Sequence, residues 1–161
     1  MDPKKLIEIM ALRDAGNAEQ ALRTAQTIIV RDPSDAMAQY QFAWTLDVLG
    51  REAEAVGHYE FALSAGLGEP ERENAMLGLG SSLRALGRFD DAERVLGGGV
   101  LLYPSNAAFR VFRAMNDYNR GEHQAAMATL LRELARSSTD PSITMYHRAI
   151  ELYAEDLNRR W

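Results

Sequence analysis

Four glycines at nearly regular intervals constrain the fold of this chain more than any other feature of its sequence. Gly16, Gly50, Gly87 and Gly121 are separated by 34, 37 and 34 residues, and an alanine follows each of them by five positions. Helix-forming sequence flanks each glycine on both sides, so each unit is predicted to be a helix, a tight turn at the glycine and a second, antiparallel helix. The period therefore predicts an all-α fold of four helical hairpins, with a small insertion after the second.

Aspartate and proline residues predict where several of these helices begin and end. Asp2-Pro3 and Asp140-Pro141 each place a capping carboxylate before a first-turn proline, so a helix is expected to start at both. Asp32-Pro33 is expected to close the second helix, with Ser34 or Asp35 capping the next one.

The segment 141–161 is predicted to be a single amphipathic helix, the ninth of the chain. Because the last unit of such an array exposes an apolar side, this helix is expected to cover the fourth hairpin as a cap. Its apolar side chains recur at the three- and four-residue spacing of one helix face: Ile143, Tyr146, Ile150, Tyr153, Leu157 and Trp161.

The hairpin unit resembles the tetratricopeptide repeat, a helical hairpin of about 34 residues with a recurrent pattern of large and small positions. The third unit matches it best, reading Met76-x2-Leu79-Gly80-x2-Leu83, then Ala92-x3-Leu96, then Pro104. The resemblance implies a right-handed α-solenoid in a single domain over residues 1–161. It implies repeats at about 2–35, 36–69, 73–106 and 107–140, with the capping helix at 141–161. The stretch from Tyr59 to Leu157 is also similar to small bacterial tetratricopeptide proteins of unassigned function, some of which are thought to dimerise.

In this family the first helices of successive repeats line a concave groove that binds the partner. The corresponding positions here are mostly apolar, and exposed apolar surface with methionines is typical of an adaptable interaction site. Tyr40 and Trp44 are the expected anchors, because aromatic residues dominate interface energetics. In the alternative interpretation, several of these side chains pack between helices. The predicted partner-binding residues are Leu6, Met10, Met37, Tyr40, Trp44, Leu77, Arg84, Val111, Met115 and Tyr118.

The groove lacks the clamp with which some family members hold the acidic C-terminus of heat-shock chaperones. That clamp consists of Lys, Asn, Asn, Lys and Arg. The expected partner is therefore a protein or peptide with an amphipathic helix or an extended apolar segment. The corresponding positions here hold Leu6, Met10, Gln41, Asn74 and Gly78.

Three consecutive glycines, Gly97-Gly98-Gly99, lie inside a predicted helix, where each costs about 1 kcal/mol relative to alanine. One interpretation is a soft helix that packs on Phe109 and Phe112. The other is close approach of a second subunit. Phe109 and Phe112 are therefore candidate contacts of a homodimer.

Charge and hydropathy narrow the classes of partner. The chain carries 18 Lys and Arg against 23 Asp and Glu, a net charge of −5, and its basic residues are scattered. Nucleic-acid binding is therefore not expected. No membrane association is expected either, because the apolar runs are far shorter than the roughly 20 residues that span a bilayer. The N-terminal segment has no apolar core of an export signal, which favours a cytoplasmic location.

The chemistry-bearing residues form no recognised catalytic or cofactor motif, so no catalytic residue, metal or cofactor is expected. The chain has no cysteine, and His58 and His123 are isolated. His147 and Glu151 lie one helical turn apart and could share a metal ion, but a metal site needs at least a third ligand. The hypothesis that this pair supports is a small metal-dependent hydrolase at the C-terminal helix.

The pattern favours a non-catalytic protein–protein interaction module. Its apolar groove is expected to bind a partner helix or peptide, or a second copy of the chain. A secretion chaperone of the tetratricopeptide type, similar in length and acidity, is the alternative among binding proteins.

Overall fold

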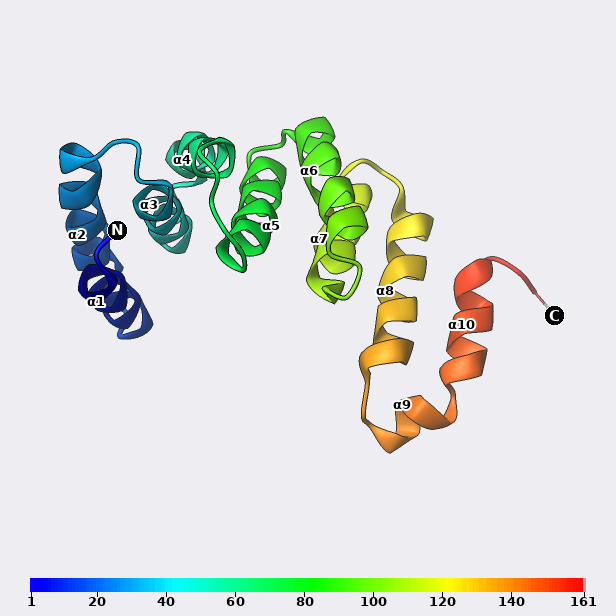
Figure 1. Ribbon diagram of the computed structural model, residues 1–161. Helices are drawn as coiled ribbons and strands as arrows, with labels where there is room; N and C mark the ends of the chain where they lie inside the picture. Colours follow the sequence, from blue (N-terminus) through cyan, green and yellow to red (C-terminus); the bar gives the residue numbers. More distant parts are fainter. Residues whose placement is uncertain (161) are drawn as a thin grey trace. The chain divides into compact units, whose positions relative to one another are not determined.

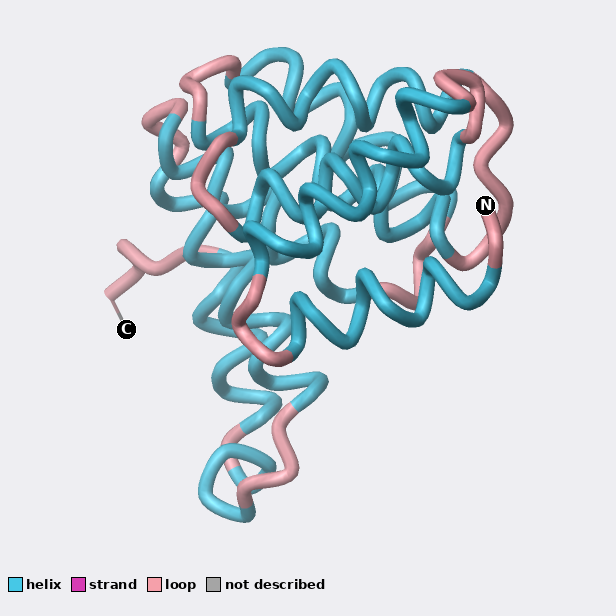
Figure 2. Tube along the Cα trace, turned by 90° about the vertical axis from the view of Figure 1, so that its left-hand side faces the viewer, coloured by secondary structure: helices cyan, strands magenta, loops and turns pink. Residues whose placement is uncertain are grey.

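The computed structural model describes residues 1–160 and places them in helices joined by loops, with no strand in that range (Figures 1 and 2). The chain divides into two compact units, one over Met1–Arg88 and the other from Phe89 onward. The single domain over residues 1–161 remains a prediction. The helices of the first unit are α1 (Pro3–Asp14), α2 (Ala18–Arg31), α3 (Ala36–Val48), α4 (Glu52–Ser64) and α5 (Glu71–Ala85). Those of the second are α6 (Phe89–Leu102), α7 (Ala107–Asn119), α8 (His123–Ser137), α9 (Pro141–Met145) and α10 (His147–Glu155).

The periodic glycines form the turns that were predicted for them. Gly16, Gly50, Gly87 and Gly121 have φ angles of 77, 68, 74 and 86°, a region that side chains of L-residues rarely adopt. The residue after each glycine donates its N–H to the carbonyl five positions earlier, at 2.8–2.9 Å. This is the Schellman arrangement that closes a helix at a left-handed residue. Each glycine of the sequence repeat therefore marks the C-terminal end of a helix.

The predicted N-caps are also present. The carboxylates of Asp2 and Asp140 accept the N–H groups of Lys4 and Ser142 at 3.0 and 2.8 Å. Asp35 caps α3 by accepting the N–H of Ala38 at 3.0 Å. Each cap occupies one of the backbone donors that the first turn of a helix leaves without a partner.

Small residues bring the helices of the first unit close together. Alanines that lie at helix crossings, such as Ala21, Ala43 and Ala55, are completely buried. Gly78 of α5 faces the Tyr59 ring of α4, and a Cβ at Gly78 would lie 2.5 Å from the phenolic oxygen. Glycine is therefore required here by close packing.

The second unit contains the glycine run, and Phe109 explains one of its members. A Cβ at Gly99 of α6 would lie 2.1 Å from the Phe109 ring of α7. Phe109 is completely buried, and its ring stacks on Tyr103 with centroids 5.7 Å apart. Gly99 therefore leaves space for an aromatic ring of the same chain. This agrees with the interpretation in which the glycine run packs on Phe109. The prediction of Phe109 as a dimer contact is wrong, because its own unit covers it.

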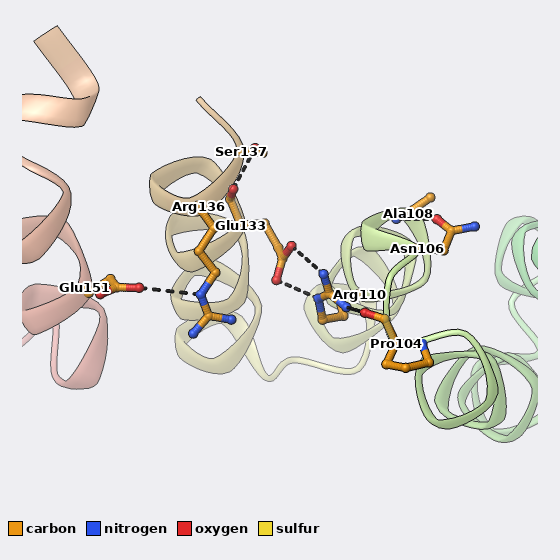
Figure 3. A network of polar contacts seen from close by, with 8 residues as sticks. All are labelled: Pro104, Asn106, Ala108, Arg110, Glu133, Arg136, Ser137 and Glu151. Atoms are coloured by element: carbon orange, nitrogen blue, oxygen red, sulfur yellow. Dashed lines mark hydrogen bonds and ion pairs between the residues drawn. The ribbon is translucent and has the colours of Figure 1, made fainter. Parts of the chain in front are cut away.

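Ion pairs join the helices of the second unit. Arg110 of α7 binds both carboxylate oxygens of Glu133 on α8, at 2.6 and 2.9 Å (Figure 3). It also donates to the carbonyl of Pro104 at 2.7 Å (Figure 3). Arg113 of α7 pairs with Glu93 of α6 at 2.6 Å. These pairs set the positions of α6 and α8 on the two sides of α7.

The C-terminal segment differs from the prediction of one helix over 141–161. It forms two helices, α9 and α10, which meet at Tyr146, and helical structure ends at Glu155 (Figure 1). The Nδ1 atom of His147 lies 3.0 Å from the Thr144 carbonyl oxygen, so this side chain competes for an acceptor that a continuous helix would use. Trp161 lies outside the described residues. The described segment therefore contains ten helices in place of the nine predicted for the chain.

Candidate functional site

The predicted partner-binding residues fall on the first helices of the hairpins, divided between the two units. In the first unit α3 packs against both α1 and α5, so these three helices follow one another along one side (Figure 1). The predicted residues of this unit therefore lie on neighbouring helices: Leu6 and Met10 on α1, Met37, Tyr40 and Trp44 on α3, and Leu77 and Arg84 on α5. Val111, Met115 and Tyr118 lie on α7 of the second unit.

Exposure distinguishes two kinds of residue in the first-unit set. Met10 and Trp44 are 41% and 37% exposed, and Leu6, Met37, Leu77 and Arg84 are half-buried. Tyr40 is only 2% exposed, so its prediction as a contact anchor is wrong. Its ring is covered because it stacks on Trp44, with centroids 5.7 Å apart, and packs against Tyr59 on its other side. Burial also raises the pKa of Tyr40 to about 12.

Trp44 is held in place by a second contact, from α1. The guanidinium carbon of Arg13 lies 3.6 Å from the centroid of the Trp44 ring. Such a cation–π contact is worth about 1–2 kcal/mol when it is partly desolvated. Trp44 therefore contacts both a buried cation and a buried phenol, while more than a third of its surface stays open to solvent.

Arg13 lies at a predicted groove position of the first repeat, but the sequence did not indicate its contact with Trp44. It is 8% exposed, and its Nη1 donates to Gln41 Oε1 at 3.0 Å and to Thr45 Oγ1 at 3.4 Å. Its burial lowers its pKa, with nearby tyrosines acting in the opposite direction. It lies three residues after Met10, on the same helix face. Its contact with Trp44 joins residues 31 positions apart, which periodicity does not reveal.

A carboxylate joins three helices of the first unit. Asp47 of α3 accepts from the Tyr59 hydroxyl at 2.8 Å and from the Ser82 hydroxyl at 2.7 Å, one on each oxygen. Burial raises the pKa of Asp47, and the two hydrogen bonds oppose this shift. Burial raises the pKa of Tyr59 as well. Because both oxygens of Asp47 are engaged within the unit, the cluster fixes α3 against α4 and α5.

On α7 of the second unit, the predicted residues are exposed to different degrees. Tyr118 is 60% exposed and tilts against the ring of His123, while Met115 is 38% exposed and Val111 is half-buried. Phe112 is half-buried, so its prediction as a dimer contact remains a prediction. The α7 surface is thus a short apolar strip of its own.

The residues of the metal hypothesis are engaged in other contacts. Glu151 pairs with Arg136 at 3.4 Å (Figure 3), and His147 bonds the Thr144 carbonyl. Over residues 1–160 no group of three or more His, Cys, Asp or Glu side chains is placed to hold a metal ion. In the same range no helix is long and apolar enough to cross a bilayer.

Comparison with known proteins identifies relatives of this fold. The sequence model of the family described as "Tetratrico peptide repeat" matches residues 36–157. The crystal structure of YrrB, described as a TPR protein with an unusual peptide-binding site, superposes with a TM-score of 0.72 at 22% identity. This similarity covers 99% of the present chain and 80% of YrrB. A double mutant of MamA (RS-1 ArsTM) superposes with a TM-score of 0.67 at 18% identity, over 94% of this chain and 92% of that one. No curated protein sequence matches the chain.

Proposed function

Because the chain belongs to the tetratricopeptide repeat family, we propose that it is a non-catalytic protein–protein interaction module. Its first unit binds an apolar or amphipathic peptide segment along α1, α3 and α5. The observation that carries this proposal is Trp44, which is 37% exposed yet in contact with both Arg13 and Tyr40. A preordered aromatic side chain costs little conformational entropy on binding, so it suits an anchor.

The surroundings of Trp44 support an apolar ligand. Met10 is 41% exposed one turn before Arg13, and the thioether side chain of methionine adapts to partners of different shape. Leu6, Met37 and Leu77 leave part of their surface open on the same three helices. The likeness to YrrB, described as a peptide-binding protein, agrees with this use of the fold. Val111, Met115 and Tyr118 are proposed as a separate contact surface on α7.

The proposal further includes a cytoplasmic location and partners that are neither nucleic acid nor membrane. The exclusion of nucleic acid rests on the net charge of −5 and on the scattered basic residues. No catalytic role is assigned to His147 and Glu151. Neither the secretion chaperone nor the hydrolase is favoured by a contact of the described residues.

The test is selection of peptides from a random display library on the wild-type protein, followed by affinity measurements with individual variants. We expect the selected peptides to be rich in apolar residues and Trp44→Ala to weaken their binding at least about tenfold, as for an interface anchor. Val30→Glu, a change of a 75% exposed residue on α2, is the matched control and leaves affinity unchanged.

A second readout follows Trp44 directly. In a Trp161→Phe background Trp44 is the single tryptophan of the chain. A bound peptide is expected to protect its fluorescence from acrylamide. Peptides that bind the Trp44→Ala variant as tightly as the wild type would place the binding surface elsewhere.

A further inference from the structure

Contacts with α8 determine which side of α10 faces its own unit. Ala154 is 2% exposed, and Arg132 of α8 donates to its carbonyl oxygen at 3.3 Å. Glu151 pairs with Arg136 of α8 at 3.4 Å (Figure 3). Ala154 and Glu151 lie one turn apart, so their side of α10 is the covered one.

The opposite side of α10 carries apolar side chains that are partly exposed. Leu152 and Tyr153 are 45% and 50% exposed, and Ala149 lies one turn before both. We call these three residues the α10 strip. Among the described residues, α8 is the helix that α10 packs against.

Two opposite charges flank the α10 strip. Arg148 and Glu155 are seven residues apart, which places them two turns apart on the same side of the helix. Both are exposed, and neither forms an ion pair with another described residue. The strip therefore carries a cation near its N-terminal end and an anion near its C-terminal end.

We propose that the α10 strip is the contact surface of a symmetric homodimer, in which α10 packs antiparallel on α10 of a second copy. An antiparallel pair reverses the order of the charges, so Arg148 of each copy faces Glu155 of the other. A parallel pair would place like charges together. The surface is thus complementary to itself, as a two-fold interface requires.

The ion pairs set the orientation, and the apolar strip supplies the association energy. The two-fold axis passes beside Leu152, where the two copies of this residue meet. This surface lies on a different helix from Phe112, the candidate dimer contact that remains from the sequence. Homodimerisation through α10 is also independent of peptide binding to the first unit.

Sedimentation equilibrium at tens of micromolar tests the proposal. We expect twice the chain mass of 17.9 kDa for the wild type and a single chain for Leu152→Glu. Arg148→Glu and Glu155→Arg should each weaken the dimer at least about tenfold, and the double variant should restore it. Val30→Glu on α2 is the control for an added charge, and circular dichroism verifies that each variant is folded.

Cysteine crosslinking distinguishes this dimer from a head-to-tail assembly. The chain has no cysteine, so Leu152→Cys introduces a single thiol. In the proposed dimer two such thiols meet, and oxidised glutathione converts them to an intermolecular disulfide. In a head-to-tail assembly α10 would meet another surface, and no such crosslink forms. A monomeric wild type, or a dimer that Leu152→Glu leaves intact, would overturn the proposal, while peptide binding by the first unit would be unaffected.

Discussion

In each of the two units an aromatic ring packs against a glycine of another helix, but different contacts hold the ring. In the first, Gly78 admits Tyr59, whose hydroxyl donates to Asp47 at 2.8 Å. In the second, Gly99 admits Phe109, whose ring carries no polar atom and stacks on Tyr103. In both units an aromatic side chain of one helix occupies the space that a Cβ of another helix would need.

The difference lies in what holds the ring. Tyr59 is positioned by a directional hydrogen bond, whereas Phe109 is positioned by close packing and by stacking on Tyr103. The polar cluster of the first unit includes Ser82 on α5, so that it joins three helices. The second unit uses ion pairs such as Arg110 with Glu133, which lie nearer to solvent than the Phe109 ring. The stability of the first unit should therefore depend on the polar partners of this cluster. The stability of the second should depend on the space beside Gly99.

Gly99→Ala should have the largest effect, because its Cβ would lie 2.1 Å from a completely buried ring. Overpacking of this kind costs about 3 kcal/mol, more than the helix propensity gained. Urea unfolding measures the loss. Gly97→Ala is the matched control, because its closest neighbour is 3.4 Å away, and it should change stability little or raise it. Equal effects of the two substitutions would show that the Phe109 ring is not the reason for a glycine at position 99.

Gly78→Ala should destabilise the protein by about 2 kcal/mol, less than Gly99→Ala. Its Cβ would meet the Tyr59 hydroxyl at 2.5 Å and displace it from Asp47. In a double-mutant cycle with Tyr59→Phe, the two losses should not add, because both remove the same hydrogen bond. Gly57→Ala on α4, with no atom within 4 Å of its Cβ, is the control and should be neutral or stabilising. Additive losses of stability would show that Gly78 does not act through this hydrogen bond.

Arg110→Met should cost about 1.5 kcal/mol, because it leaves the Glu133 carboxylate, which is buried, without its bidentate partner. Thermal unfolding measures the effect. Arg136→Met removes a pair with both partners more than 40% exposed, so it should cost less than about 0.5 kcal/mol. The reverse order would contradict the view that burial determines the value of ion pairs in this unit.

The smallest effect concerns pH and is confined to the first unit. His58 Nδ1 lies 2.6 Å from Gln39 Oε1, and burial lowers the pKa of His58 below 6.5. The unfolded chain then binds a proton at higher pH than the folded one, so stability should fall as the pH is lowered through about 6.5. The difference between wild type and His58→Gln in urea unfolding from pH 7.5 to 5.5 isolates this contribution. A difference that stays constant with pH would exclude His58 as its source.

Local features of the sequence determined much of the architecture. A glycine between two helix-forming segments is enough to predict that a helix ends there with a residue in the left-handed backbone conformation. This conformation at Gly50 or Gly121 depends on the residue itself and its neighbours. The same holds for the caps at Asp2 and Asp140, whose carboxylates reach only two residues along the chain. Repetition of these local signals predicted the hairpins and their family.

Only the tertiary structure decided which apolar residues face solvent and which are covered. Tyr40 and Trp44 are one turn apart and similar in character, yet Tyr40 is buried and Trp44 is 37% exposed, because Tyr59 of another helix packs against Tyr40. Phe109 is likewise buried by Gly99, ten residues earlier on a different helix. The break at Tyr146 depends on side chains that compete for backbone carbonyls. Burial depends on the register between helices, and that register is set by contacts between residues distant in sequence, which a local pattern does not encode.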